Sequence, residues 1–362
     1  STRVRSSAAS DVYKRQKLSV VLVAIAGQFI YSLPTKACTG ITLKSKGETT
    51  IVARTIEWGG SNLNSQYVIV PRGHTEQSYT PDGMNGMTFT SRYGYVGFAV
   101  EQKDFVAEGL NEVGLSAGLF YFPNYGKYQD YDFTEKEKSI SDLQLVSWIL
   151  GKCKTVDEVK EAVKKVRIIN IDPRASTVHW RFTDTSGHQL VLEIINGVPE
   201  FYENKLGVLT NSPGFEWQLT NLNNYVNLFP GTAPAQHLGN IELSSFGAGS
   251  GFLGIPGDVT PPSRFVRAAF YQTSAPQQDT PLKTVLQCFQ ILNNFDIPIG
   301  IEFKPGEVPC DIPSATQWTS ATDMTNRIIY FRTMYNSAIR SIDLNTICLL
   351  YTSPSPRDMR RS

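Results

Sequence analysis

The sequence predicts an α+β protein with a four-layer αββα sandwich, in which two stacked antiparallel sheets carry a helix layer on each outer face. Three regions contain short β-branched and aromatic runs bounded by Gly, Asn and Pro, as strands are. Two blocks of helical periodicity separate these regions. Stacked sheets covered by helices accommodate the resulting order of strands, helix pair, strands, helix pair and strands.

The strands are expected in three groups. The early group comprises 38–43, 50–56, 67–70, 93–100 and 114–120, the middle group 176–184, 189–194, 200–203 and 207–210, and the late group 316–323, 327–332 and 338–343. Ser186-Gly187 and Asn196-Gly197 lie between middle strands and have the composition of tight hairpin turns.

Each helical block predicts a pair of helices. In the first block, residues 139–152 show helical periodicity, and the sequence Thr155-Val156-Asp157-Glu158 is a capping box that opens a helix to about Val166. In the second, 263–273 and 280–294 repeat the pair, with Thr280 as N-cap and Pro281 at the first helical position. The stretch 213–254, rich in Asn, Gly and Pro, is expected to be a long functional excursion.

Composition excludes several classes of protein. The chain has 362 residues, of which 41% are hydrophobic and 19% charged, as in an ordinary globular protein. Its net charge of +1 gives no sign of the strongly basic surface that binds nucleic acid. The basic flanks carry +3 (1–16), +2 (17–37) and +2 (348–362), so the body 38–347 carries −6. Five cysteines are too few for a disulfide scaffold. The four histidines lack metal-site spacing, so no metal is expected.

The two ends are expected to lie outside the folded domain. Residues 7–16 (SAASDVYKRQ) and 348–358 (CLLYTSPSPRD) lack hydrophobic periodicity and resemble translated sequencing-adapter sequence. We therefore expect 1–16 and 348–362 to be non-native tails, although genuine disordered tails would look the same. The predicted domain is 38–347.

A targeting segment precedes this domain. Lys17 is followed by a mostly apolar run over 18–30, and the small residues Thr35 and Ala37 stand before Cys38, which is the pattern of a secretory signal peptide at 17–37. The run is too short to span a bilayer. We expect secretion to the periplasm or outside the cell. Lipidation of Cys38 is the competing interpretation, and a non-enzymatic envelope lipoprotein would follow from it.

Cleavage after Ala37 would make Cys38 the first residue of the mature protein, where it would supply both a thiol and an α-amino group. The α-amine has a pKa of about 7.7–8.0, so it can act as a base near neutral pH. A nearby guanidinium would favour the thiolate, and Arg54 on the next strand is the candidate. An inert core cysteine and a papain-type pair with His179 or His188 are the alternatives.

Six segments in one order resemble the choloylglycine hydrolase family, which joins bile salt hydrolases and penicillin V acylases within the N-terminal-nucleophile hydrolases. They are ACTG (37–40), ARTIEW (53–58), EGLNEVGL (108–115), GVLTNSP (207–213), LNNY (222–225) and GDVTPPSRF (257–265). The likeness is strongest to bile salt hydrolases of Bacteroides-type gut bacteria. The resemblance implies the same layered sandwich, amide hydrolysis and no cofactor.

The resemblance also implies roles for individual residues. Cys38 matches the nucleophile whose free amine is the base, and Arg54 the arginine beside the thiolate. Asn211 matches the oxyanion-hole asparagine, and Arg264 a second arginine that stabilises charge around the site. Glu57 stands where the family commonly has Asp, so it keeps the carboxylate with one more methylene.

Substrate class is less defined by the motifs. Tyr121 stands where many bile salt hydrolases have an oxyanion asparagine and penicillin V acylases have tyrosine. A conjugated bile salt needs an apolar cleft, for which the candidate lining residues are Phe120, Phe122, Tyr125 and Phe215. Penicillin V acylase, or another N-acyl amide acylase such as one acting on acyl homoserine lactones, is the alternative function. The resemblance further implies a homotetramer, with 213–245 as the contact.

Overall fold

Two large antiparallel sheets are stacked face to face in the computed structural model, which describes residues 37–58, 63–172, 176–304, 306 and 315–350. The first sheet has the strand order β1 (Cys38–Lys44), β2 (Thr50–Trp58), β16 (Ala315–Asp323), β17 (Ile328–Thr333) and β18 (Asn336–Asp343). The second has the order β13 (Val198–Glu203), β12 (Gln189–Ile195), β11 (Val178–Thr183), β8 (Ser116–Tyr121), β7 (Val106–Asn111), β6 (Tyr95–Ala99) and β3 (Gln66–Val70).

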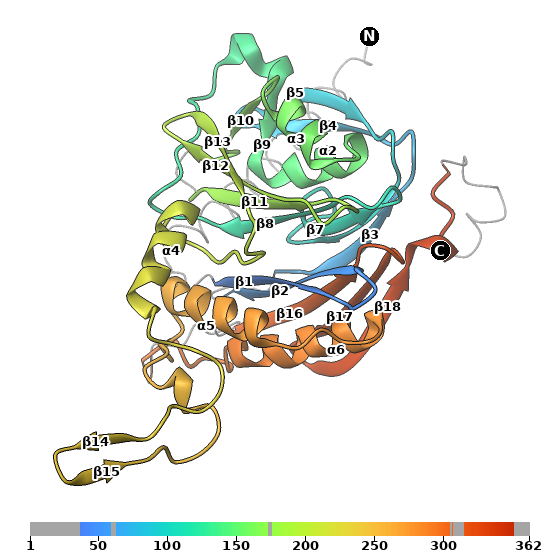
Figure 1. Ribbon diagram of the computed structural model, residues 1–362. Coiled ribbons are helices and arrows are strands. Elements are labelled where there is room, and N and C mark those ends of the chain that lie inside the picture. Colours follow the sequence, from blue (N-terminus) through green and yellow to red (C-terminus); the bar gives the residue numbers. More distant parts are fainter. Residues whose placement is uncertain (1–36, 59–62, 173–175, 305, 307–314, 351–362) are drawn as a thin grey trace, which may run out of the picture.

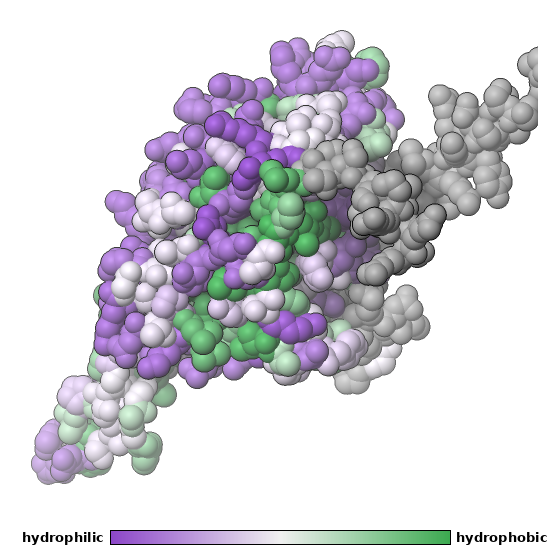
Figure 2. Space-filling model, turned by 90° about the vertical axis from the view of Figure 1, so that its right-hand side faces the viewer, coloured by the Kyte–Doolittle hydropathy of each residue, from purple (hydrophilic) through white to green (hydrophobic). Residues whose placement is uncertain are grey.

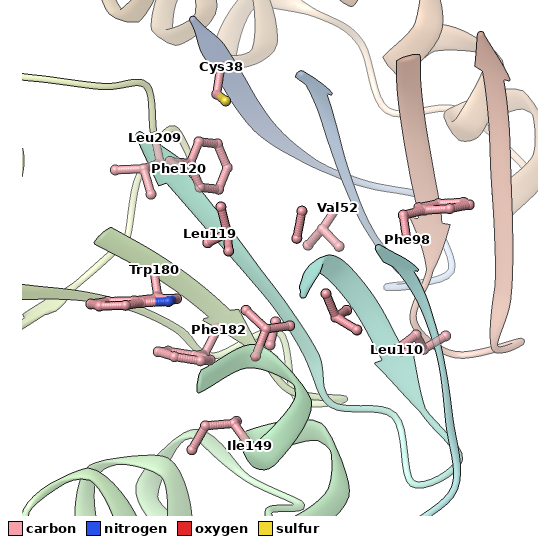
Figure 3. Close-up of a cluster of buried hydrophobic side chains, with 14 of the residues drawn as sticks. Cys38, Val52, Phe98, Leu110, Leu119, Phe120, Ile149, Trp180, Phe182 and Leu209 are labelled. Carbon is pink, nitrogen blue, oxygen red and sulfur yellow. The ribbon is translucent and has the colours of Figure 1, made fainter. Parts of the chain in front are cut away.

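Helices cover the outer face of each sheet. Helices α5 (Pro261–Ser274) and α6 (Pro281–Leu292) lie against the first sheet, and α2 (Leu145–Lys152) and α3 (Val156–Val163) lie over the second (Figure 1). The four layers that the order of elements predicts are therefore present. The core fills the space between the sheets and beneath α2, where Trp180, Phe182 and Ile149 are drawn with their neighbours in Figure 3.

Local sequence signals place several boundaries. Thr155 caps α3 by accepting the Glu158 N–H at 3.2 Å, and Thr280 caps α6 by accepting the Lys283 N–H at 3.3 Å. The hairpin between β12 and β13 turns through Asn196 and Gly197, both with positive φ, as a two-residue turn requires.

Two predicted elements differ in the structure, and one strand of the second sheet was missed. The first predicted helix begins only at Leu145, because 139–144 form β9 (Ser139–Ser141), parallel to β10 (Arg167–Ile169), and a 3₁₀ turn η2 (Asp142–Gln144). Residues 207–210 are not a strand, but Leu209 forms a bridge with Gly40. Strand β7, with the sequence VAEGLN, was not predicted, because Glu, Gly and Asn have low strand propensity.

The remaining elements are a hairpin of β4 (Thr75–Thr80) and β5 (Gly83–Thr90), which was also not predicted, and short 3₁₀ helices. These are η1 (Phe133–Lys138), η3 (Leu222–Tyr225), η4 (Ser250–Phe252), η5 (Asn293–Phe295) and η6 (Leu344–Thr346). The excursion after β13 contains α4 (Phe215–Asn221) and a hairpin of β14 (Gln236–Leu238) and β15 (Ile241–Leu243), which projects away from the layers (Figure 1).

The C-terminal part of the described chain packs on the body past the boundary predicted at 347. Leu349 is buried, and its carbonyl accepts the Arg72 N–H at 2.9 Å. The proposed signal peptide lies outside the described residues apart from Ala37, which is buried. Within the described ranges, no helix has the length and apolar character needed to cross a membrane.

Candidate active site

Cys38 is the first residue of β1 and is only 4% exposed. Its side chain lies at one end of the core cluster, above Phe120 of β8 on the facing sheet (Figure 3). Strand alternation places Cys38 and Gly40 on the same face, and Gly40 is paired with Arg54 of β2. The sheet register therefore brings Cys38 and Arg54 to the face that meets the second sheet.

Hydrogen bonds fix both the N–H of Cys38 and the carbonyl of the residue before it. In the full chain this nitrogen belongs to the Ala37–Cys38 peptide, and its N–H donates to Asn211 Oδ1 at 2.7 Å. The Ala37 carbonyl accepts the Glu57 N–H at 2.8 Å. Removal of the residues through Ala37 would convert this nitrogen into an α-amine beside Asn211.

The Arg54 guanidinium is buried between the sheets. Its Nη1 donates to the Leu119 carbonyl at 2.6 Å and forms an ion pair with Glu108 Oε2 at 3.3 Å. The guanidinium lies 4.0 Å from the centroid of the Phe120 ring, which adds a cation–π contact. Within the described part of the chain, Nη2 is buried without a hydrogen-bond partner.

The pKa of the Cys38 thiol is raised, and the largest cause is burial, which disfavours the thiolate. Arg54 and Arg264 lower this pKa, Glu57 raises it, and a hydrogen bond from the Tyr121 backbone N–H lowers it. The effect of Arg54 has the predicted sign. The thiol pKa is nevertheless raised overall, because desolvation outweighs the two guanidinium groups in this closed site.

Glu57 lies on the opposite face of β2 from Arg54, where helices cover the sheet. Its Oε1 accepts a hydrogen bond from Thr316 Oγ1 at 3.0 Å, while Oε2 is buried without a partner among the described residues. Burial raises the pKa of Glu57 to about 7, although Arg264 acts in the opposite direction. A buried carboxylate oxygen with free acceptor capacity is suited to a cationic donor.

Asn211 and Arg264 close the site from the side of α5. Arg264 Nη2 donates to Asn211 Oδ1 at 2.8 Å, and Arg264 Nη1 donates to Thr39 Oγ1 at 2.8 Å and to the Cys38 carbonyl. Asn211 Nδ2 donates to the Tyr121 carbonyl at 2.7 Å. The structure thus brings together all six predicted catalytic positions, although they come from distant parts of the sequence.

The backbone of Tyr121 faces the site, whereas its hydroxyl group bonds elsewhere. The backbone N–H contacts the Cys38 sulfur and the carbonyl accepts from Asn211. The Tyr121 hydroxyl pairs with Ser176 Oγ at 2.7 Å. The arrangement leaves a backbone donor near the sulfur whatever side chain stands at position 121.

The predicted cleft aromatics divide into two kinds. Phe120, Phe122 and Phe215 have 0%, 0% and 1% of their surface exposed, so in this structure they pack the interior and do not form an open wall. Tyr125 is 52% exposed and can meet a ligand.

The papain-type alternative is not supported by the positions of the histidines. His179 lies between Glu193 and the Thr210 carbonyl, and His188 Nε2 contacts Glu203, so neither imidazole is paired with Cys38. Within the described ranges, no group of three or more metal-binding side chains is present.

Sequence reasoning missed two charged residues behind Arg54. Glu108 on β7 lies between Arg54 and Arg181 of β11, whose Nη2 is 3.9 Å from Glu108 Oε1. All three side chains are buried. A Cβ at Gly118 would lie 2.0 Å from Glu108 Oε2, so this glycine makes room for the carboxylate. The signal that could have indicated Glu108 is an acidic residue inside an otherwise buried strand.

Comparison with known proteins agrees with this geometry. A family model described as linear amide C–N hydrolases, choloylglycine hydrolase family, matches residues 38–357. A bile salt hydrolase/transferase of Clostridium perfringens is 32% identical over 314 residues, covering 85% of this chain and 92% of that protein. A penicillin V acylase of Pectobacterium atrosepticum is 25% identical over 361 residues, covering 92% and 88% of the two chains.

Solved structures show the same architecture. The crystal structure of a mutant conjugated bile acid hydrolase from Clostridium perfringens superposes with a TM-score of 0.77 and 31% identity, covering 87% of this chain and 95% of the other. The fold is therefore that of the N-terminal-nucleophile hydrolases, as the sequence predicted. The match spans most of the chain, and the chain belongs to the choloylglycine hydrolase family of linear amide C–N hydrolases.

Proposed function

We propose that this enzyme is a bile salt hydrolase that cleaves the amide bond of glycine- or taurine-conjugated bile acids with Cys38 as an N-terminal nucleophile. The observation that carries the proposal is the convergence on Cys38 of the Tyr121 N–H, Asn211 and the two guanidinium groups. The relatives named as bile salt hydrolases support the substrate class.

The first half of the reaction transfers the acyl group to sulfur. The α-amine of mature Cys38 takes the thiol proton, and the thiolate attacks the amide carbonyl carbon, whose π electron pair moves to oxygen. Asn211 Nδ2, which carries a second hydrogen besides the one given to Tyr121, and the Tyr121 N–H would hold this oxyanion. Collapse breaks the C–N bond, and the α-ammonium protonates the leaving nitrogen.

The second half releases the bile acid. The neutral α-amine takes a proton from water as the oxygen attacks the thioester carbonyl carbon. The C–S bond then breaks with its electron pair going to sulfur, which releases the bile acid, and the Cys38 thiolate takes the proton back from the α-ammonium. Arg54 and Arg264 stabilise the thiolate each time it forms, because both lower the thiol pKa. Glu57 Oε2, which has no hydrogen-bond partner among the described residues, would accept a hydrogen bond from the α-ammonium.

The test is a side-by-side assay of the chain that begins at Cys38. Release of glycine or taurine from conjugated bile salts, detected with ninhydrin, supports the proposal, and Cys38→Ala should abolish it. Hydrolysis of penicillin V to phenoxyacetate without action on bile salts would instead support the penicillin V acylase function. That alternative is favoured by Tyr121, a tyrosine where penicillin V acylases have one, and by the similarity to the Pectobacterium enzyme.

We further propose that the chain is exported by the segment 17–37 and works in the periplasm or outside the cell. We also propose a homotetramer whose contacts involve the excursion at 213–245. The exposed apolar side chains on the projecting hairpin support this assembly: Leu238, Ile241 and Leu243 are 68%, 62% and 46% exposed. Figure 2 shows hydrophobic residues on this projection.

A further inference from the structure

A buried imidazole–carboxylate pair lies behind Asn211 and has no part in the chemistry described above. His179 of β11 and Glu193 of β12 are 0% and 2% exposed. His179 Nδ1 is 3.0 Å from Glu193 Oε1, and His179 Nε2 is 3.0 Å from the Thr210 carbonyl oxygen.

Counting donors fixes how many protons this pair holds. A backbone carbonyl only accepts, so the bond to Thr210 requires a hydrogen on Nε2. A second hydrogen must lie between Nδ1 and Oε1, whichever atom carries it, because otherwise two lone pairs would face each other. The pair therefore holds two protons, either as imidazolium with carboxylate or as imidazole with carboxylic acid.

The surroundings keep water away from these bonds. The Phe122 ring stacks on the imidazole with the ring centroids 4.3 Å apart and the planes 8° apart, and Phe120 meets it edge-on at 6.2 Å. Tyr202 of β13 also faces Glu193, and its pKa is raised by burial and then by the carboxylates of Glu193, Glu200 and Glu216. In such a site a lost hydrogen bond leaves a buried polar group without a partner, which is costly.

The pair holds both ends of the segment that carries Asn211. His179 binds the carbonyl of Thr210, the residue directly before Asn211. Glu193 Oε1 accepts the N–H of Phe215 at 2.9 Å, where α4 begins. Gly214 also lies in this segment. A Cβ atom at this position would be only 3.1 Å from Glu193 Oε2, so the glycine lets the backbone pass close to the carboxylate. One buried pair thus clamps residues 210–215 from both ends.

We propose that His179 and Glu193 are positioning residues that fix Asn211 for oxyanion stabilisation by keeping two protons and clamping the 210–215 segment. The inference rests on the proposed function of Asn211. It assigns to Phe120 and Phe122 the role of enclosing the pair, in place of the cleft-lining role expected from the sequence.

Two substitutions of His179 separate positioning from simple packing. Gln places an amide N–H near the position of Nε2 and can keep the bond to Thr210. Asn places its amide near Nδ1 and keeps a donor for Glu193 but loses the bond to Thr210. We expect His179→Asn to lower kcat by about 100-fold, as loss of an oxyanion donor does, with KM little changed. His179→Gln should retain most of kcat. Equal losses in two folded variants would overturn the positioning role.

A spectroscopic measurement tests the hydrogen on Nε2, which the bond to Thr210 requires, without relying on activity or on a variant that folds. In the wild-type chain labelled with ¹⁵N-histidine, Nε2 of His179 should be protonated at neutral pH. Its signal is identified by its absence from His179→Gln or, if that variant does not fold, by its contacts with the Phe122 ring. A bare Nε2 with hydrogen only on Nδ1 would refute the inference. An enzyme inactive on every amide would refute the proposed function and leave this measurement to decide the clamp.

Discussion

At the scale of single residues, the site is a balance between burial and charge at the Cys38 sulfur. Burial raises the thiol pKa, and two guanidinium groups and a backbone N–H oppose it. A thiolate formed in such a place is weakly solvated, so each opposing group has a large effect. Replacing one of these groups should therefore raise or lower the pKa of the Cys38 thiol, according to the sign of the effect that the group has on it.

Arg54→Met should raise the pKa of the Cys38 thiol further, because it removes a charge that lowers this pKa. The pH profile for alkylation of Cys38 by iodoacetamide should shift to higher pH. Arg267→Met is the matched control: this arginine lies one turn from Arg264 on α5 and donates to the Pro256 and Asp258 carbonyls. An unchanged profile in Arg54→Met would mean that Arg54 acts on substrate or structure.

Glu57 should make stability depend on pH in the unprocessed chain. Its pKa is raised on folding from 4.5 to about 7, so its stabilising contribution is complete below pH 4.5 and is lost as the pH rises through 7. Glu57→Gln should therefore become more stable relative to the parent between about pH 5 and pH 8, measured by urea unfolding of chains carrying Cys38→Ala. Glu200→Gln, on an exposed residue of β13, should show no such trend. A constant difference between Glu57→Gln and its parent would contradict the assigned shift.

Tyr121→Asn should alter substrate preference more than catalysis, because the backbone N–H that contacts the sulfur stays in place. We expect a changed ratio of bile salt to penicillin V hydrolysis and a modest change in the faster rate. A loss of about 100-fold or more on both substrates, in a folded variant, would show that the tyrosine side chain itself holds the oxyanion.

At the scale of elements, the hairpin β14–β15 is the part whose sequence is least explained by the fold of one chain. Its base is fixed by backbone hydrogen bonds, from Phe229 N–H to the Gly251 carbonyl at 3.1 Å and from Gly251 N–H to the Gly231 carbonyl at 3.0 Å. Both of its strands are exposed along their length. Apolar side chains on such a projection are suited to burial against another copy of the chain.

Replacing Leu238, Ile241 and Leu243 together with Ser should convert the proposed tetramer into smaller species while the sheets stay folded. Light scattering coupled to size-exclusion chromatography measures the mass, and circular dichroism checks the fold. Glu242→Gln changes a polar residue of the same hairpin and should leave the mass unaltered. A parent chain that is monomeric, or a triple variant of unchanged mass, would refute the assigned contact.

At the scale of the whole molecule, processing after Ala37 decides whether the base exists. The Cys38 nitrogen is an amide in the full chain, and an amide cannot take the thiol proton. Expression of the full chain in a secreting host should yield a protein whose intact mass, measured by mass spectrometry, is that of a chain beginning at Cys38. A chain that retains Ala37 should be inactive. Full activity with Ala37 attached would refute the shared nucleophile and base, and a diacylglyceryl mass on Cys38 would support lipidation.

Local sequence patterns were enough to predict the layers of this protein. Periodicity and the capping residues Thr155 and Thr280 are local signals, so α3, α5, α6 and most strands could be predicted to within a few residues. Order along the chain then limited the architecture to stacked sheets with outer helices. Elements with weak propensity, such as β7 around Glu108, escaped prediction, because their strand state is imposed by neighbours on both sides.

For the site, motifs along the chain were enough to select Cys38, Arg54, Asn211 and Arg264, which stand in a family order. Their electrostatics follow from the tertiary structure instead, since desolvation depends on the closure of two sheets over the sulfur. Tertiary structure also joins His179 to Glu193, and Glu108 to its two arginines. Those contacts depend on strand register and on packing across layers, which bring together residues that no spacing along the chain relates.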